Sequence, residues 1–369
     1  MNDSTLQLRT ITATAPEQPR IIALIPARNE ADRIAASIVG LQAQTRAPDE
    51  IIAVTNNCTD DYATAIAARD AGAAVLDLHG IEGKKAGALN RALDEILPEL
   101  GDDDLVLIQD ADTVLVEGFL EHAAAAMKRR VGAVGGVFYG EPGGGLLGQL
   151  QRMEYERYAW EIDRKGGRAT VLTGTASLFR VRVLRQVKAS RLTGRLPGGS
   201  GYYTIDSLTE DDEITKAVKT LGYRTMSPAG CTVTTEVMTS LPKLWNQRIR
   251  WQRGALENLR SYGLTKVTAR YFGQQIMMGA GAIAFALYLC LTAWQLALFG
   301  SLAFSPLWST IGLIFIVEKV VSVWRAGWRS RLLAALLVVE LAYDLFQHAV
   351  YARALYDLAL RREEHWAAT

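Results

Sequence analysis

The sequence predicts an α/β domain with a mostly parallel sheet, followed by a block of apolar helices. Three short runs rich in β-branched residues, at 21–25, 51–54 and 105–108, are typical of strands buried on both faces. Helical patterns at 31–44, 60–71 and 86–97 alternate with them. This βαβα order favours a sheet covered by helices on both sides.

The composition excludes some classes of protein. The 40 Lys and Arg residues nearly balance the 39 Asp and Glu residues, so we do not expect a nucleic-acid-binding protein, which usually has a strong basic excess. The three cysteines are scattered and indicate reduced thiols rather than a disulfide framework or a zinc site. The N-terminus is polar up to Pro19 and has no apolar signal core, so we do not expect secretion.

Polar loops follow the three predicted strands. They contain Asn29 and Glu30 after the first strand, Asn56 after the second, and Asp110 and Asp112 after the third. Ligands of open α/β sheets bind at the carboxyl ends of the strands. We therefore expect these loops to share one rim and to form a binding site.

The segment between the third strand and residue 265 contains two further features. Residues 146–165 predict a helix that lies either at a membrane surface or packed on the sheet as an ordinary amphipathic helix. Residues 193–203 are rich in glycine and lack periodicity, which predicts a mobile loop near the site.

Residues 271–317 contain no Asp, Glu, Lys or Arg. A spanning helix needs about 20 apolar residues, so this run suits two spans joined by a turn at 300–306. Basic residues precede and follow the pair, and the turn has none, which places the large domain in the cytoplasm. A buried pair of helices in a soluble protein is the alternative.

Residues 332–350 predict a third span or a helix in the membrane plane. Glu340, Asp344 and His348 interrupt this segment at four-residue spacing and share one helix face. Ionisable groups within a bilayer face protein or water, so we expect this face to contact other helices, in this chain or in a second copy.

The residues Asp110 and Asp112 point to the same side at a strand end. Two carboxylates there can hold a divalent cation that also meets a diphosphate. Strand ends often carry Asp for capping alone, so the pair by itself is a weak signal. Nearby, Lys84 and Lys85 lie at a predicted helix start, where the helix dipole disfavours cations unless an anion is bound.

Two later motifs add candidates. Thr209 and the acids Glu210 and Asp211 open a helix, where Thr is a good N-cap and acids suit the first turn. One of these carboxylates can also serve as a general base. Gln247 and Trp251 share a helix face near Arg250, which can bind a diphosphate, although Trp and Arg are also common in interfacial helices.

Taken together, these motifs resemble the membrane-bound processive branch of the family 2 glycosyltransferases, which includes cellulose, chitin-oligosaccharide, hyaluronan and poly-N-acetylglucosamine synthases. The resemblance covers residues 22 to about 260 and the apolar helices after them. It rests on the segments Ile25-Pro26-Ala27-Arg28-Asn29-Glu30, Lys85-Ala86-Gly87, Asp110-Ala111-Asp112, Thr173-Gly174-Thr175, Thr209-Glu210-Asp211 and Gln247-Arg248-Ile249-Arg250-Trp251.

The resemblance implies a GT-A (Rossmann-like) fold, a UDP-sugar donor, Mg²⁺ or Mn²⁺, and inversion at the anomeric carbon. It implies that Asp211, with Glu210, is catalytic and that Asp112, with Asp110, holds the metal. The implied donor-binding residues are Pro26, Ala27, Asn29, Glu30, Asn56, Lys85, Asp110 and Arg250. The implied acceptor-binding residues are Trp251, Gln247, Thr173, Gly174 and Thr175. Asn56 departs from the family, which usually has an Asp that reads the uracil.

We therefore expect a multi-pass protein of the plasma or inner membrane that extends a β-linked glycan. N-acetylglucosamine and glucose are the expected sugars. A single-addition transferase acting on a lipid or protein acceptor is the alternative, and a catalytically silent nucleotide-sugar-binding protein is a third. The expected domains are a flexible tail at 1–18, the GT-A domain at 19–265 with amphipathic surface helices near 146–165 and 241–261, two or three spans at 271–352, and a C-terminal tail at 353–369.

Overall fold

The computed structural model describes residues 18–301 and 305–360. They form two compact units, which are described separately. The first unit comprises the described part of Met1–Pro142 together with Tyr158–Val237, and the second comprises Gly143–Arg157 with the described part of Met238–Thr369. The expected tail at 1–18 lies outside the described residues except for its last position.

The first unit is built on a seven-stranded sheet with the order β3-β2-β1-β4-β8-β6-β9. Its strands are β1 (Ile21–Ala27), β2 (Glu50–Asn56), β3 (Ala74–Leu78), β4 (Leu105–Gln109), β6 (Val131–Gly135), β8 (Ala176–Arg180) and β9 (Arg224–Met226). The four strands from β3 to β4 are parallel, which confirms the mostly parallel sheet that the sequence predicts, although β3 is not among the three predicted strands. The unpredicted strand β8 runs antiparallel to both of its neighbours.

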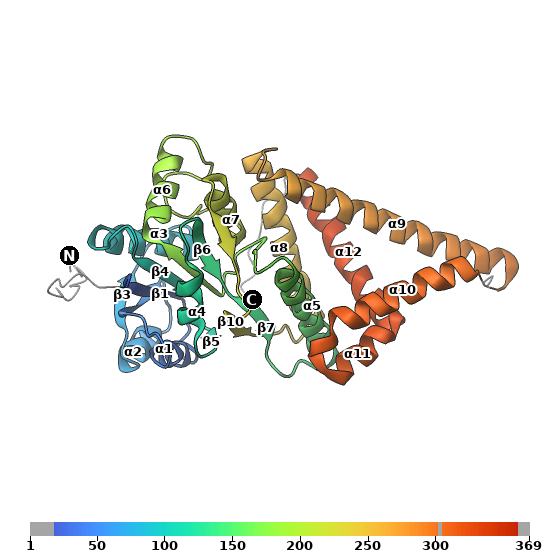
Figure 1. Ribbon diagram of the computed structural model, residues 1–369, viewed down its shortest axis with the longest axis horizontal. Coiled ribbons are helices and arrows are strands. Elements are labelled where there is room, and N and C mark those ends of the chain that lie inside the picture. Colours follow the sequence, from blue (N-terminus) through green and yellow to red (C-terminus); the bar gives the residue numbers. More distant parts are fainter. Residues whose placement is uncertain (1–17, 302–304, 361–369) are drawn as a thin grey trace. The chain divides into compact units, whose positions relative to one another are not determined.

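Helices cover both faces of this sheet, as the βαβα pattern predicts (Figure 1). They are α1 (Ile34–Gln42), α2 (Ala63–Asp70), α3 (Lys84–Ile96), α4 (Phe119–Ala126), α6 (Val181–Leu192) and α7 (Glu210–Thr220), with a short 3₁₀ turn at Leu97–Glu99. The side chains of β1 alternate between the two faces. Ile21, Ala23 and Ile25 pack against α1, α2 and α4 in one core cluster.

A small second sheet completes the first unit. It joins β5 (Val114–Leu115), β10 (Thr232–Thr235) and β7 (Val137–Gly140) in that order. Helix α5 (Gly145–Arg164) follows β7 and contributes to both units. The second half of α5 packs on β7 through Ala159 and Ile162.

The second unit contains the C-terminal helices. They are α8 (Leu241–Tyr262), α9 (Ala269–Phe299), α10 (Pro306–Ser322), a 3₁₀ turn at Trp324–Ala326, α11 (Gly327–Ala335) and α12 (Leu337–Ala359). The helix α8, which we placed in the N-terminal domain, belongs to this unit because Leu244 packs in a core with Met153 of α5 and Tyr343 of α12.

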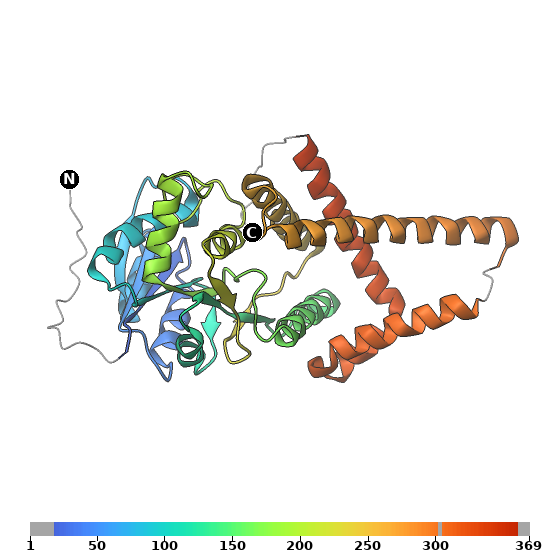
Figure 2. The ribbon, with the colours of Figure 1, turned by 45° about the horizontal axis from the view of Figure 1, so that its top comes forward.

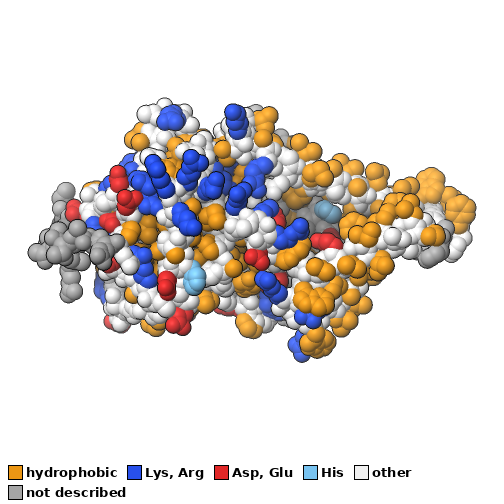
Figure 3. Space-filling model, viewed as in Figure 1, with side chains coloured by type: hydrophobic (Ala, Val, Ile, Leu, Met, Phe, Trp, Pro, Cys, Tyr) orange, Lys and Arg blue, Asp and Glu red, His pale blue; other side chains and the backbone are white. Residues whose placement is uncertain are grey.

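Helix α9 is long and strongly apolar. Its most apolar window has a mean hydropathy of 2.0 and no residue buried within the protein. Figure 2 shows α9 as the longest helix of this unit, with α10 following its far end, and Figure 3 shows hydrophobic side chains along both. Among the described residues α9 alone is long and apolar enough to cross a membrane by itself. The helices α10 and α11, which are bent by 61° relative to each other, form a second candidate if they make up one broken span.

The predicted third span at 332–350 is not one helix. The chain breaks at Leu336, between α11 and α12, and α12 then continues to Ala359. Helix α12 therefore includes the first part of the predicted tail at 353–369, and residues 361–369 lie outside the described part. The turn predicted at 300–306 is described only at its two ends, where α9 stops at Phe299 and α10 begins at Pro306.

The ionisable face of α12 contacts other helices, as predicted. Glu340 lies 2.7 Å from Arg157 of α5 and 3.1 Å from Lys319 of α10, and Lys319 also lies 2.7 Å from Asp344. His348 packs beside Phe285 of α9. A homo-oligomer formed through the C-terminal helices stays a prediction.

Candidate active site

The predicted rim exists at the carboxyl ends of β1, β2 and β4. Asn29 adopts the left-handed backbone conformation, and its amide donates to Thr59 Oγ1 at 3.1 Å and accepts from Thr59 N at 2.8 Å. These contacts join the loop after β1 to the loop after β2. Left-handed conformations are costly for residues other than glycine and cluster at functional sites. Pro26 and Ala27 form the last pairs of β1 with β2 at this rim.

Asn56 is buried and holds the start of α3. Its Nδ2 donates to the carbonyl oxygen of Lys84 at 2.9 Å, and Lys84 is itself in the left-handed conformation. Its Oδ1 is buried and accepts no hydrogen bond from the described residues. One N–H of the amide is therefore used within the protein, and contact of Oδ1 or of the second N–H with a donor base stays a prediction.

The glycine of the Lys-Ala-Gly segment is required by close packing. A Cβ atom at Gly87 would lie 1.8 Å from the carbonyl oxygen of Glu82, so no larger residue fits without moving the backbone. The tight first turn of α3 thereby fixes Lys85 at the rim.

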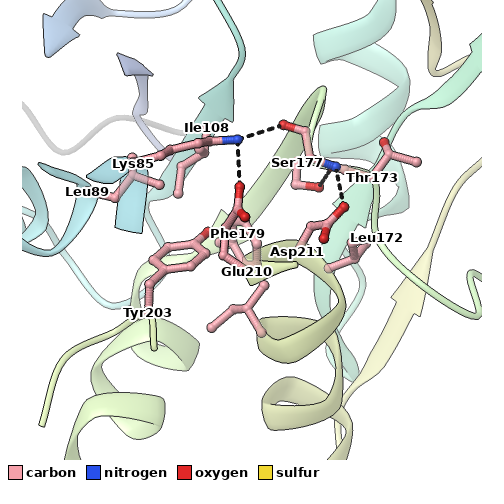
Figure 4. A pocket seen from close by; sticks show the side chains of 12 residues that line it. Lys85, Leu89, Ile108, Leu172, Thr173, Ser177, Phe179, Tyr203, Glu210 and Asp211 are labelled. Atoms are coloured by element: carbon pink, nitrogen blue, oxygen red, sulfur yellow. Dashed lines mark hydrogen bonds and ion pairs between the residues drawn. The ribbon is translucent and has the colours of Figure 1, made fainter. Parts of the chain in front are cut away.

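Lys85 joins three loops of the site. Its Nζ lies 2.6 Å from Asp110 Oδ1, 2.9 Å from Glu210 Oε1 and 3.5 Å from the carbonyl oxygen of Gly174. Figure 4 shows Lys85 pointing toward Glu210 and the turn beside Asp211. Burial lowers the pKa of Lys85, but the two carboxylates outweigh burial and raise it well above its usual value. Lys85 is therefore a cation at every physiological pH.

Carboxylates gather beside this lysine. Burial raises the pKa of Asp110, and Asp112 and Glu210 raise it further, against the opposing effect of Lys85. Burial and then Asp112 also raise the pKa of Glu30, so the acids after β1 and β4 face one another. Their oxygen atoms are the ligand type that Mg²⁺ and Mn²⁺ prefer. Within the described residues no group of three or more His, Cys, Asp or Glu side chains is arranged to hold a metal.

Asp211 lies in the first turn of α7 with both carboxylate oxygens fixed. Oδ2 accepts from Gly174 N at 3.0 Å (Figure 4). Oδ1 accepts from Asp212 N at 2.8 Å. Burial, and then the charges of Glu210 and Asp212, raise the pKa of Asp211 to about 7. An acid with such a pKa can accept a proton near neutral pH.

The remaining acids of this run have structural partners. Asp212 forms a buried ion pair with Lys216, and Glu213 lies 2.6 Å from the buried side chain of Arg191. Thr209 occupies the N-cap position, as predicted, but its side chain forms no capping hydrogen bond. Two of the four acids from Glu210 to Glu213 are thus explained by packing rather than by chemistry.

The turn at Thr173, Gly174 and Thr175 connects Asp211 to the sheet. Besides the bond from Gly174 to Asp211, the carbonyl oxygen of Thr175 accepts from Asp110 N at 2.9 Å, and Thr173 Oγ1 donates to the carbonyl oxygen of Gly136. The turn therefore sets the spacing between the loop after β4 and the first turn of α7. It lines a small cavity together with Lys85 and Asp211.

Asn90 and Tyr203 were not predicted from the sequence as residues of the site. Asn90 Oδ1 accepts from Tyr202 N and Tyr203 N at 2.8 Å each, and its Nδ2 donates to the carbonyl oxygen of Tyr203 at 2.9 Å. Arg191 also donates to Gly198 within the same loop. The glycine-rich loop lies near the site, as predicted, but it is anchored rather than free. Asn90, a poor helix former just after the lysines of α3, was a usable signal.

Gln247, Arg250 and Trp251 belong to the second unit, on α8. All three side chains are partly buried. Gln247 Oε1 accepts from Arg248 at 3.3 Å, and the Arg248 guanidinium lies 4.2 Å from the centre of the Trp251 ring.

The sequence is similar to those of poly-beta-1,6-N-acetyl-D-glucosamine synthases from staphylococci. The chain is 26% identical over 257 residues to the poly-beta-1,6-N-acetyl-D-glucosamine synthase of Staphylococcus aureus strain MSSA476, covering 67% of this chain and 58% of that protein. It is 24% identical over 244 residues to the enzyme of the same name from Staphylococcus epidermidis, covering 64% and 54%. The chain thus spans little more than half the length of these relatives.

Among solved structures, a mannosyltransferase from Pyrobaculum calidifontis in complex with GDP-Man and Mn²⁺ has a similar fold. The TM-score is 0.63 with 18% identity, covering 94% of this chain and 88% of that chain. This likeness concerns the fold, which is a mixed α/β fold of the GT-A type. The model of the family described as "Glycosyltransferase like family 2" matches residues 19–254, well over half of the chain. The chain therefore belongs to the family 2 glycosyltransferases.

Proposed function

We propose that the protein is an inverting glycosyltransferase that moves a sugar from a UDP-sugar to the hydroxyl of a growing β-linked glycan at the cytoplasmic face of a membrane. The observation that carries the proposal is the fixed carboxylate of Asp211. It has a pKa of about 7 and lies in the same cluster as Lys85 and Glu210. N-acetylglucosamine and glucose are the proposed sugars, with N-acetylglucosamine favoured by the names of the similar staphylococcal enzymes.

In the proposed reaction, Asp211 accepts the proton of the acceptor hydroxyl. The acceptor oxygen forms a bond to the anomeric carbon while the bond from that carbon to the diphosphate oxygen breaks, and the configuration inverts. The hydrogen bonds to Asp211 from Gly174 N and Asp212 N leave little freedom for its carboxylate. Such preorganised groups require no rearrangement during the reaction.

The diphosphate of the donor is proposed to lie at the rim beside Lys85. The cationic Nζ of Lys85 lies beside Asp110 and Glu210. The positive charge would stabilise the negative charge that develops on the departing nucleotide. Asp112, with Asp110, would hold Mg²⁺ or Mn²⁺. The bound cation would supply neutralisation of the diphosphate charge. The backbone of Asn29 and Glu30 and the Oδ1 atom of Asn56 are proposed to contact the nucleoside.

The roles of α8 follow from its motif. Arg250 is proposed to bind the diphosphate, and Gln247 and Trp251 are proposed to hold the acceptor sugar, whose apolar face suits a flat indole ring. Thr173, Gly174 and Thr175 are proposed to lie beneath the same acceptor. These assignments rest on the resemblance of Gln247-Arg248-Ile249-Arg250-Trp251 to the family motif.

We also propose that α9 spans a bilayer and that α10 with α11 forms a second, broken span. Support comes from the hydropathy of α9 and from the absence of buried residues in its most apolar window. The basic residue Lys266 precedes α9 and Arg270 lies in its first turn, which favours a cytoplasmic catalytic unit. Only one described helix is long and apolar enough to span alone, and this favours, as a second candidate, a single-addition transferase with a lipid or protein acceptor.

The test is a panel of nucleotide sugars offered to the detergent-purified full chain, with UDP, GDP and other nucleotides measured and the products sized. Release of UDP and a ladder of products would support the proposed polymerase, and a single product would support the second candidate. Asp211→Asn serves as the matched inactive control. A wild-type protein that binds donors but transfers nothing would overturn both and leave a silent nucleotide-sugar-binding protein.

A further inference from the structure

The motif on α8 contains an arginine that the proposed reaction does not use. The Arg248 side chain is only 3% exposed, and its Nη2 lies 3.0 Å from Glu154 Oε2 on α5. The same oxygen accepts from the Tyr343 hydroxyl at 2.7 Å and from Gln347 Nε2 at 3.2 Å, both on α12. This one oxygen of Glu154 thus accepts hydrogen bonds from α8 and from α12, and its donor on α8 is the buried cation of Arg248.

Arg248 in turn contacts both outer residues of the motif. Its Nη1 donates to Gln247 Oε1 at 3.3 Å, and its guanidinium lies over the Trp251 ring, 4.2 Å from the ring centre. The Tyr155 ring is on another side at 5.8 Å. A cation at this distance from an indole face is attracted to it, and the attraction strengthens when water is excluded.

We propose that Arg248 is a positioning residue for the acceptor site, and that Glu154 and Tyr343 hold it in place. In this arrangement Glu154 fixes the guanidinium, and the guanidinium fixes the plane of the Trp251 ring, which is the route by which Glu154 acts on the acceptor. The inference rests on the proposed function, because it assumes that Gln247 and Trp251 bind the acceptor sugar.

Burial is what makes the arrangement specific. A buried arginine requires a partner for its charge, and removing one partner of such a pair is costly because the other charge is left uncompensated. Without the charge of Glu154, we expect the Arg248 guanidinium to move toward water. The Trp251 ring then loses its contact with the cation. Because the Tyr343 hydroxyl donates to Glu154, helix α12 also helps to hold Arg248 in place.

The experiment compares Glu154→Gln with Glu257→Gln in the full chain. Glu257 is a matched control because it also pairs with an arginine of α8, Arg253 at 2.7 Å, and its side chain is 32% exposed against 33% for Glu154. The donor is the UDP-sugar found active in the panel, and the acceptor is a β-1,6-linked N-acetylglucosamine oligosaccharide. Acceptor KM, kcat and UDP release without acceptor are measured for each protein.

We expect Glu154→Gln to raise the acceptor KM by about three- to thirtyfold, the range set by a cation–π contact. The kcat and the acceptor-free release of UDP should change by less than about twofold, and Glu257→Gln should match the wild type. In a Trp251→Ala background, Glu154→Gln should cause no further rise, because effects that act through one residue are not additive.

Tyr343→Phe, which removes one donor to Glu154, decides the matter if Glu154→Gln fails to fold. It should raise the acceptor KM in the wild-type background and leave it unchanged in the Trp251→Ala background. An unchanged acceptor KM in these variants, or a rise that persists without Trp251, would overturn the positioning role. A wild-type protein that transfers from no donor would instead refute the proposed function, so the two failures are distinguishable.

Discussion

Replacing Asp211 with asparagine should abolish turnover and alter the pH dependence of stability. The folded protein raises the pKa of this carboxyl from 3.8 to about 7, so the folded state binds its proton more tightly than the unfolded chain does. The resulting stabilisation is full below about pH 4 and is lost as the pH rises toward 7. A difference of about three pKa units corresponds to about 4 kcal/mol.

Asparagine removes this titration but introduces a conflict of its own. Both oxygens of Asp211 accept backbone N–H groups, from Gly174 and Asp212, and an asparagine amide has only one oxygen. An unsatisfied buried group costs about 1–3 kcal/mol. We therefore expect Asp211→Asn to be more stable than the wild type at pH 8 by about 1–3 kcal/mol, and less stable at pH 4.

Denaturant unfolding of both proteins in detergent, at pH 4 and at pH 8, measures this difference. Transfer should fall by about 10²–10⁴-fold, the usual contribution of a general base, while UDP still binds. Equal pH dependence of stability in the two proteins would contradict the raised pKa, and substantial residual transfer would contradict the assignment of Asp211 as the base.

Three further predictions concern the same unit. The kcat/KM of the wild type should fall as the pH drops below about 7, because the base must be deprotonated and the pKa of Asp211 is raised to about 7; a profile flat from pH 5 to 8 would argue against it. Chelation of divalent metal with EDTA should stop transfer, and Mn²⁺ or Mg²⁺ should restore it, whereas undiminished activity in EDTA would exclude the metal role of Asp112. Asn90→Ala removes three hydrogen bonds to Tyr202 and Tyr203, so it should lower the free energy of unfolding by about 1–3 kcal/mol and increase proteolysis within the loop at 193–203; unchanged proteolysis would mean that other contacts anchor the loop.

Continuous apolar runs were sufficient to predict three of the four adjacent parallel strands of the sheet, but not β3. The strands β1, β2 and β4 are buried on both faces, so their sequences are continuous apolar runs. The antiparallel strand β8 was missed because its position depends on pairing with β4 and β6, which are distant in sequence. Local pattern contains no information on such pairing.

Site residues could be predicted where the residue type is not the one that the local secondary structure favours. Lys85 at a helix start and the acids of α7 were found in this way, and they do meet at 2.9 Å between Lys85 and Glu210. Residues whose role is to hold others, such as Asn90 and Glu154, were missed because their partners lie between 94 and 193 residues away along the chain. The anchoring of the glycine-rich loop could not be read from its own composition.

The ion pairs of α10 and α12 have a consequence for biogenesis. Lys319 is paired with Glu340 and Asp344, and Glu340 is also paired with Arg157. Charged residues within a spanning helix oppose insertion, by about 2.5–3.5 kcal/mol each at the helix centre, and α10 has Glu318 beside Lys319. If α10 enters the bilayer, it should therefore do so after α12 has been synthesised, with the neutral cluster already assembled. A chain ended between Ser322 and Glu340 should be retained by quality control and degraded, although its catalytic unit is complete.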